Sequence, residues 1–524
     1  MLKNYRYVIL ACLFFLAWKF FLTGVLWIGR TSPPEADDSF IYAANIESVR
    51  RCPTLLFCSD TLYPLSSSLG FDRLIYRLSL GTFSRVVGLS SVDTYHISFY
   101  LGYLFLLPAL VLLLKSLDSS NKLTAVSLIG LALYHGQGSY HGFYWVVPSF
   151  FSLALLFYFI SAVISGRNSW KYSLLLIPIG VYTHLIFFYS LIAILPGIFV
   201  FDWFTSGKIN KNLLIRVTIS LLICVGSYFP TEIYLNKHNS QYSYGLINQI
   251  STNSVSIPIF LESSVDVLVT KSLFPGFNVV WESYFRFLTM HWSILVGFVI
   301  CLYVLWHFKK FKLLGLYFSA LIFTIVSTIS TYGSRGLIVI WPLTYIVLAQ
   351  GWWLAYQHVT LNKGFLNKVA KIFLGLIVAF AVTANLAYSY YSNVQKNMDN
   401  SWDVDPGLEA YVTKNVNKKT PVYYTGKILE SYFGSNSLYK KVNRISEPHK
   451  SCIYFASSKG DSNFAGSDLD KIFSLAAGLL GFDRQILSEK VTPQSIPTGF
   501  VLNKQFGSIS VYSNIDCTDN KVKI

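Results

Sequence analysis

Charged residues are scarce in this sequence: Asp, Glu, Lys and Arg make up 13% of the 524 residues, whereas 53% are hydrophobic and 17% aromatic. Soluble domains carry about 25% charged residues. The shortage therefore excludes a soluble fold and indicates a chain that crosses a membrane many times. Acidic residues are the scarcer sign, 26 against 42 basic residues, which leaves a net charge of +16. Because most of this excess lies in short loops between apolar runs, it indicates membrane orientation and not nucleic-acid binding.

A signal-peptide cleavage site is also missing near the N-terminus. The apolar run at 7–28 is too long for a signal peptide, and no small-residue site follows it before an acidic stretch. We interpret this run as the first transmembrane helix. Further runs of about 17 to 25 residues predict an all-α membrane domain of about eleven helices, the others lying near 96–114, 123–139, 143–165, 172–187, 188–203, 212–230, 291–306, 313–330, 336–356 and 368–390.

Basic residues distinguish the two faces of this domain. With the N-terminus in the cytoplasm, every inside loop holds Lys or Arg, whereas the short outer connections at 136–142 and 187–189 hold none. This is the positive-inside pattern. The pattern favours helical hairpins at 123–165 and 172–203; the alternative at 172–203 is one long tilted helix, which would invert the topology downstream. Broken helices at membrane depth are tolerated where they line a cavity. We therefore expect these two hairpins to form cavity walls.

The C-terminal part lacks long apolar runs. Short β-like runs, "TPVYYTG", "SCIYFAS" and the hairpin-like "GFVLNKQFGSISVYS", flank one helical stretch near 468–481 and predict a small α/β domain. The sequence thus predicts two domains. Residues 1–394 form the membrane domain, with long outer loops at 29–95 and 231–290, and residues 395–524 form a domain outside the membrane, in the periplasm.

Cysteine is rare outside the apolar runs. Three of the seven cysteines fall within them, and the other four form two pairs on the predicted outer side, Cys52 with Cys58 and Cys452 with Cys517. Disulfides persist in the periplasm and outside the cell. We expect both pairs to be disulfides, with reduced structural thiols as the alternative.

Metal-binding spacing is absent from the nine histidines, none of which stands in H-x-x-x-H or H-E-x-x-H. No cofactor is therefore expected to be required, although an acidic pair described below could bind a divalent metal. Five histidines collect at the predicted outer ends of helices. They belong either to the interfacial belt or to a polar cavity that binds phosphate or orients an acceptor: His96, His135, His141, His184 and His291.

Three carboxylates stand together soon after the first helix, in "SPPEADDSFIYAANI" at 32–46. Asp38 is placed to cap a short helix that starts at Ser39, and Glu35 is a solvated neighbour. Because capping needs one carboxylate, Asp37 remains as a candidate general base that could accept a proton from a hydroxyl nucleophile. No general acid is needed where the leaving group is a phosphate.

Outer basic residues are candidates for binding the phosphate of a lipid carrier. Arg335, at the start of the tenth helix, opposes the positive-inside bias, and a guanidinium can bind phosphate oxygens through two hydrogen bonds. Snorkelling to lipid headgroups is the alternative. Arg73 and Arg77 lie four apart in "FDRLIYRLSLGTFSRVVG", which predicts an amphipathic helix lying flat on the membrane. A plain interfacial helix is the alternative there.

Three motifs together resemble the polytopic GT-C glycosyltransferases, especially the branch of the protein O-mannosyltransferases and the lipid A aminoarabinose transferases. They are the pair Asp37 and Asp38 followed by a tyrosine-containing helix, the hairpin "GVYTHLIFFYS", and "SRGLIVIWPL". The resemblance covers roughly 1–390. It implies an undecaprenyl-phosphate-linked sugar donor in the outer leaflet, with Asp37 as general base. Many relatives have Glu at the position of Asp38, so the roles of the two carboxylates stay open.

The sequence thus predicts an inverting glycosyltransferase of the bacterial inner membrane. It would move a sugar to a glycan or lipid acceptor hydroxyl on the periplasmic face, in lipopolysaccharide, O-antigen or surface-glycan modification. An O-antigen polymerase or ligase, built on outer arginines, is one alternative. A transporter or flippase is another, but it would carry ionisable residues at helix centres, where the sequence has few. The side chains expected at the acceptor and cavity are Tyr42, His135, His141 and His184.

Overall fold

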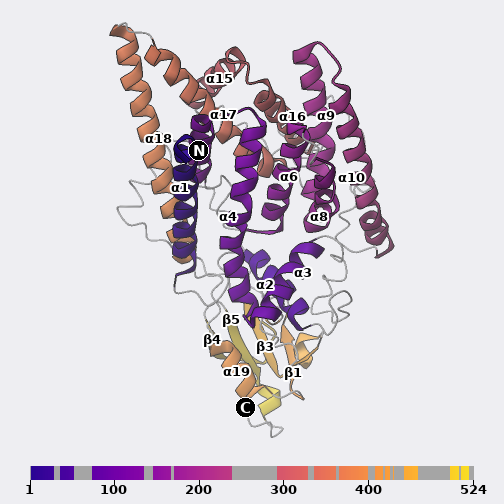
Figure 1. The fold of residues 1–524 in the computed structure, drawn as a ribbon. Coiled ribbons are helices and arrows are strands. Elements are labelled where there is room, and N and C mark those ends of the chain that lie inside the picture. The colour runs from indigo at the N-terminus through magenta and orange to yellow at the C-terminus, as the bar shows by residue number, and fades with distance from the viewer. Residues whose placement is uncertain are drawn as a thin grey trace, which may run out of the picture.

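A computed structural model of the chain shows a long helical bundle with a small sheet at one end (Figure 1). Several expected features lie outside the residues that it describes, among them Cys52, Cys58, His135, His141, His291 and the helical stretch near 468–481. The described residues are 2–28, 36–51, 73–134, 146–166, 170–238, 292–327, 335–361, 365–398, 407–416, 419–424, 429, 433, 442–445, 447–457, 496–506 and 509–518.

The bundle belongs to a multi-pass membrane protein. Among the described residues, seven helices are long and apolar enough to cross a membrane: α1 (Leu2–Trp27), α4 (Ser91–Ser116), α6 (Pro148–Ser165), α9 (Ile186–Ser206), α10 (Lys211–His238), α17 (Arg335–Leu361) and α18 (Phe365–Met398). Three apolar helices are shorter: α5 (Asn121–Leu133), α15 (Trp292–His307) and α16 (Phe311–Ser327). The expected apolar runs therefore coincide with helices, while a total of about eleven crossings stays a prediction.

Contacts between distant loops bring the basic helix ends to one face of the bundle. The Nζ atom of Lys122, at the start of α5, lies 6.0 Å from the ring centre of Tyr7 in α1. Lys312 of α16 forms an ion pair of 2.7 Å with Asp118, which follows α4. Both contacts join segments that the positive-inside pattern assigns to the same side. The helix directions thus agree with the alternation of basic and non-basic loops along the sequence.

The chain between α6 and α10 leaves this face and returns to it. Arg216 of α10 donates a hydrogen bond of 2.5 Å to the carbonyl of Val163, near the end of α6. In between, α8 (Leu176–Thr183), which follows the short α7 (Trp170–Ser173), is separated from α9 by extended backbone at His184. A Cβ on Gly180 would lie 2.3 Å from the ring of Phe187. The expected helix break is therefore present, a few residues before its expected position.

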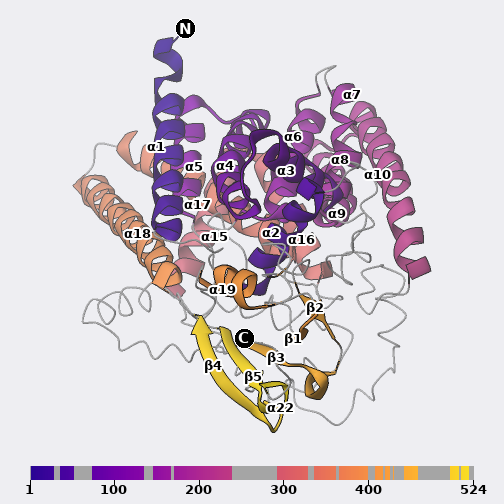
Figure 2. The same ribbon diagram turned by 90° about the horizontal axis from the view of Figure 1, so that it is seen from below.

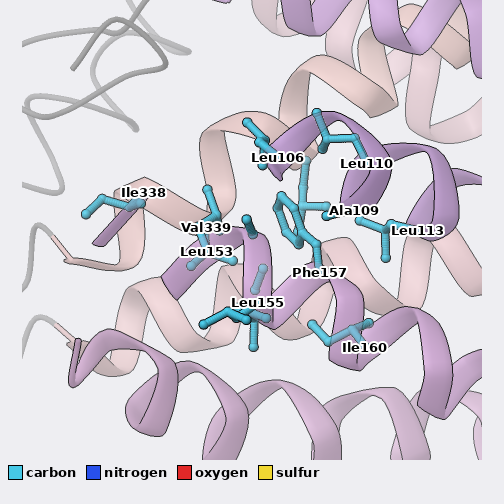
Figure 3. Close-up of a cluster of buried hydrophobic side chains, with 14 of the residues drawn as sticks. Leu106, Ala109, Leu110, Leu113, Leu153, Leu155, Phe157, Ile160, Ile338 and Val339 are labelled. Carbon is cyan, nitrogen blue, oxygen red and sulfur yellow. The ribbon is translucent and has the colours of Figure 1, made fainter. Parts of the chain in front are cut away.

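One continuous apolar core joins the bundle. Within a membrane, such a core is stabilised by close packing of side chains. Figure 3 shows the part in which three helices meet. Its buried side chains are Leu106, Leu110 and Leu113 of α4, Leu153, Phe157 and Ile160 of α6, and Ile338 and Val339 of α17.

An ionisable side chain not singled out from the sequence lies inside this core. Lys19 of α1 is fully buried, and its Nζ donates a hydrogen bond of 2.5 Å to the carbonyl of Tyr134, where α5 ends. With 13 residues, α5 is about 20 Å long, shorter than a hydrocarbon core of about 30 Å. Its last carbonyls therefore need partners within the membrane, and Lys19 supplies one. This lysine is explained by the short helix and needs no transport pathway.

The C-terminal part forms a five-stranded mixed sheet in the order β2-β1-β3-β5-β4. β1 pairs in parallel with β2 and β3, and the hairpin β4–β5 pairs antiparallel with β3 through β5. The elements are α19 (Gly407–Asn415), β1 (Pro421–Tyr424), β2 (Asn443–Arg444), the 3₁₀ helix η4 (Pro448–Lys450), β3 (Ile453–Ser457), β4 (Phe500–Phe506), β5 (Ile509–Asn514) and α22 (Ile515–Thr518).

This sheet has a core of its own, separate from that of the bundle. Leu408 and Val412 of α19 pack on one face of the sheet, against Val422, Phe455 and Val511. The three β-like runs of the sequence correspond to β1, β3 and the hairpin β4–β5. The boundary expected near residue 394 falls within the last turns of α18, which continues to Met398.

A disulfide joins Cys452 and Cys517, one of the two pairs expected from the sequence, with Cα atoms 5.6 Å apart. Replacing both by serine is expected to destabilise the sheet domain by about 2–5 kcal/mol, because the bond restricts an unfolded chain of 65 residues between them. Limited proteolysis of the purified protein measures this effect. The double variant should be cleaved within 407–518 at a protease concentration that leaves the wild type intact. Equal resistance of the two proteins would contradict the prediction.

Candidate functional site

Two helices of the first outer loop, α2 (Ala36–Arg51) and α3 (Leu74–Val87), lie at the end of the bundle that faces the sheet (Figures 1 and 2). They pack on each other and on α4, and α3 also packs on α8, which leads into the break at His184. A glycine allows α2 and α3 to approach closely: a Cβ on Gly81 would lie 2.3 Å from Cβ of Val49. The candidate site is therefore built around this pair of helices.

The two candidate carboxylates belong to the first turn of α2. This helix begins at Ala36, before Asp37 and Asp38, so the expectation that Asp38 caps a helix starting at Ser39 is wrong. In the first turn, the unpaired N–H groups and the helix dipole favour negative charge. The position therefore favours the ionised carboxylate that a general base needs. Both side chains lie outside the described part of the chain.

Tyr42, one turn after Asp38, connects α2 to the neighbouring helices. Its side chain is buried, and its ring centre lies 5.9 Å from that of Tyr76 in α3 and 6.0 Å from that of Tyr95 in α4. The guanidinium carbon of Arg73 lies 5.3 Å from the ring centre of Tyr42, within the range of a cation–π interaction. The helix that carries the acidic pair is thus packed against a predicted phosphate-binding arginine.

Arg73 itself does not belong to α3. It precedes the helix in the left-handed conformation, with φ 66° and ψ 14°, and its carbonyl accepts a hydrogen bond from the N–H of Arg77 at 3.0 Å. The predicted helix is present, but it begins at Leu74, so the expectation that it includes both Arg73 and Arg77 is wrong. Left-handed residues other than glycine are uncommon and collect at functional sites. Arg77 lies within α3, half-buried.

The Tyr76 hydroxyl is suited to donate hydrogen bonds, not to accept a proton. Burial raises the pKa of Tyr76 well above its usual range, the Tyr95 and Tyr42 hydroxyls raise it further, and Ser98 and Arg73 oppose the shift. A phenol with a raised pKa stays protonated at neutral pH. Tyr76 is therefore not a candidate for the general base.

One buried carboxylate of α2 was not singled out from the sequence. Glu47 is 1% exposed, and its two oxygens accept hydrogen bonds of 2.8 Å from Nε and Nη2 of Arg50. The hydrogen bond to Glu47 raises the pKa of Arg50. A carboxylate held in this way is a weak base, so Glu47 stabilises α2 and Asp37 remains the candidate. The three-residue spacing of Glu47 and Arg50 could have identified this pair.

The His184 imidazole caps the helix break. Its Nδ1 accepts a hydrogen bond of 3.1 Å from the N–H of Ile186, at the start of α9, and Ser152 donates to its carbonyl at 3.3 Å. An accepting Nδ1 places the proton of the neutral ring on Nε2. His184 thus has a structural role that the sequence did not reveal, and its expected contact with an acceptor stays a prediction.

The ends of α1, α4 and α17 that lie away from the basic face are at this same end of the bundle. Trp27, the last residue of α1, stacks on His96 of α4 with ring centres 4.4 Å apart. The Nζ atom of Lys371 lies 5.8 Å from the ring of Tyr356, which places the late part of α17 at the basic face. Arg335, the first residue of α17, is therefore at the opposite end, as expected, although its side chain lies outside the described residues.

No cluster of three or more His, Cys, Asp and Glu side chains able to hold a metal ion occurs among the described residues. The side chains of Asp37 and Asp38 lie outside the described part of the chain, so this absence does not concern them. Metal dependence therefore stays as the sequence left it, possible for the acidic pair but not indicated.

The fold matches that of a known membrane enzyme. Two solved structures of an oligosaccharyltransferase from Archaeoglobus fulgidus superpose on the chain with a TM-score of 0.51 each, at 12% and 13% identity, covering 92% of this chain and 68% and 69% of theirs. One is tethered to an acceptor peptide containing the NVT sequon, and the other, of AglB, is bound to an inhibitory peptide and a dolichol-phosphate. No protein-family model and no curated protein matches the chain. At such low identity the match shows a shared fold alone.

Proposed function

We propose that this protein is a membrane glycosyltransferase that moves a sugar from a polyprenyl-phosphate carrier to an acceptor hydroxyl. The observation that carries the proposal is the meeting of α2 and α3 in a GT-C fold. Asp38 lies one helical turn before Tyr42 in α2, with Asp37 directly before it, and the contact places the ring of Tyr42 against Arg73 at the start of α3. A base and a phosphate-binding cation are the two groups that the reaction requires.

In the proposed reaction, the Asp37 carboxylate removes the proton of the acceptor hydroxyl as its oxygen attacks the anomeric carbon of the sugar. The new carbon–oxygen bond forms on the face opposite the phosphate, so the configuration is inverted. The bond to the carrier oxygen breaks, and its electron pair remains on the lipid phosphate. Arg73, with Arg335 and Arg77 as further candidates, neutralises that charge. Tyr42, His135, His141 and His184 are the candidates for orienting the acceptor.

The class of donor is supported by the neighbouring fold. AglB is bound to a dolichol-phosphate in one of the matching structures, and a lipid phosphate suits a site at the membrane face. For this chain we propose an undecaprenyl-phosphate-linked sugar and a glycan or lipid acceptor, as in lipopolysaccharide or O-antigen modification. The branch that includes the O-mannosyltransferases and aminoarabinose transferases transfers single sugars in this way and remains the proposed placement.

The proposed location is the bacterial inner membrane, with the sheet domain in the periplasm. The sheet lies at the end of the bundle away from the N-terminus (Figure 1). Because Lys122 contacts Tyr7 near that terminus, the positive-inside pattern assigns the sheet to the outer side. The disulfide between Cys452 and Cys517 suits the same oxidising compartment.

This orientation predicts opposite labelling of two exposed positions. In spheroplasts, a Lys504→Cys variant in the sheet domain should react with a membrane-impermeant maleimide. A Ser206→Cys variant, at the last residue of α9, should react only once the membrane is permeabilised. Both positions are exposed, so accessibility within the fold is matched. The reverse labelling pattern would invert the proposed topology.

A donor panel tests the proposed function directly. Purified protein in lipid nanodiscs would be incubated with a series of undecaprenyl-phosphate monosaccharides and a membrane glycolipid extract as acceptor. Release of undecaprenyl phosphate together with transfer of a single labelled sugar is the expected result. Addition of many repeat units would favour a polymerase instead, and no release from any donor would count against a glycosyltransferase.

A further inference from the structure

Among the residues that the structure describes, two ring nitrogens at the outer end of the bundle are enclosed without a hydrogen-bond partner. They are Nε1 of Trp27 and Nε2 of His96, whose rings stack with centres 4.4 Å apart and planes 13° apart. The Trp27 side chain is 5% exposed, so it does not reach water as an ordinary interfacial tryptophan does. A buried N–H without an acceptor destabilises a fold, and such groups call for a functional explanation.

This pair lies close to the proposed catalytic helix. The ring of Trp27 is 6.0 Å from that of Tyr95, and Tyr95 is 6.0 Å from Tyr42 of α2, which follows Asp38 by one turn. Thr94, beside Tyr95, is fully buried, and its hydroxyl also lacks a partner in the described part of the chain. Partnerless polar atoms of α1 and α4 therefore gather next to the site that holds the acidic pair and Arg73.

We propose that Trp27 and His96 form a subsite that binds an oxygen atom of the lipid-linked donor, either a sugar hydroxyl or a phosphate oxygen. This inference rests on the proposed function and adds a donor contact that specifies the substrate. The indole N–H can only donate a hydrogen bond, so its ligand must present an acceptor oxygen. The indole N–H is already desolvated and is held in place by the stacked rings. Both conditions strengthen the hydrogen bond that it would make to the ligand. A subsite of this kind rejects analogues that lack the oxygen.

Trp27→Phe tests the subsite, because phenylalanine keeps an aromatic ring in the stack but has no N–H. In the full-length protein, the KM for the donor that the wild type turns over should rise about tenfold, the effect of about one lost hydrogen bond. The kcat should stay within about twofold. Any loss of thermal stability should reflect only the smaller ring, because the indole N–H has no hydrogen-bond partner among the residues that the structure describes.

Trp18→Phe is the matched control. Trp18 lies in the same helix, its Nε1 also has no partner within the described part of the chain, and its ring stacks on Phe21 at 5.5 Å. It is further from the outer end. Its KM should equal that of the wild type. An unchanged KM in Trp27→Phe, or an equal rise in both variants, would overturn the subsite.

Binding measurements distinguish the two sources of the oxygen and need no turnover. Affinities of wild type and Trp27→Phe would be measured for undecaprenyl phosphate and for the sugar-linked donor. A weaker affinity for both lipids identifies a phosphate oxygen, and a weaker affinity for the sugar-linked donor alone identifies a sugar hydroxyl. Equal affinities in the two proteins would reject the subsite. A wild type that binds these lipids but transfers no sugar would instead count against the proposed function.

Discussion

Asp37→Asn is expected to lower the turnover of sugar transfer by about 10²- to 10⁴-fold while the protein folds as the wild type does. Asparagine has nearly the shape of aspartate and is accepted in the first turn of a helix such as α2, but its amide cannot take a proton from the acceptor hydroxyl. The loss should therefore appear in kcat, with the donor KM nearly unchanged. Turnover of the best donor in the panel, measured beside a thermal melting curve, gives both quantities.

Two neighbouring carboxylates serve as controls for Asp37. Glu35→Gln should leave turnover near the wild-type value, because Glu35 is interpreted as a solvated neighbour. Asp38→Asn should have a smaller effect than Asp37→Asn if Asp37 is the base, and a larger effect would exchange the two roles. Full activity in Asp37→Asn would remove the proposed base and favour a polymerase or ligase that depends on outer arginines.

Gly81→Ala is expected to have the second largest effect. Its new Cβ would lie 2.3 Å from Cβ of Val49, so α2 and α3 must move apart, at a cost of about 1–3 kcal/mol. Because α2 carries the acidic pair and α3 follows Arg73, this separation changes the distance between the base and the phosphate site. A misplacement of about 1 Å can lower turnover by about 10²-fold. Melting temperature and turnover of the purified variant would measure both effects.

A second substitution, at Val49, tests whether the close contact between α2 and α3 causes the effect of Gly81→Ala. Adding Val49→Gly to Gly81→Ala removes the Val49 carbons that the new Cβ would meet and should restore part of the lost turnover. The recovery is reduced by the cost of a glycine inside a helix, about 1 kcal/mol, and by the cavity left because valine has two more side-chain carbons than alanine. Gly226→Ala in α10 is the matched control, because a Cβ there meets nothing within 4 Å. Similar losses in Gly226→Ala and Gly81→Ala would show that the close contact is not responsible.

Much of the fold was accessible from the sequence because the signals are local. A run of apolar residues long enough to cross the bilayer must form a helix, since no other partner for its backbone exists in lipid. The apolar runs accordingly coincide with helices, and the break between α8 and α9 was expected. The sheet strands were accessible from the same kind of local pattern. The start of α2 was not, because helix boundaries depend on weak capping preferences that neighbouring helices outweigh.

The candidate site could be predicted only in part. Asp37 and Asp38 follow the first helix directly, so their position at one membrane face follows from the sequence alone. The conformation of Arg73 does not, because the residue is held outside α3 by packing between helices. The three-residue spacing of Glu47 and Arg50 can be recognised in the sequence, but it does not reveal that Glu47 is buried.

By itself, therefore, the sequence determined the membrane class, the helical segments and the face to which the acidic pair belongs. These depend on hydropathy and charge along short stretches of chain. Only the tertiary structure decided which groups meet. It joined Lys19 to the end of α5, placed Tyr42 against Arg73, and stacked Trp27 on His96. Each contact links segments far apart in the chain, and such contacts are determined by how the helices pack and not by the pattern within any one of them.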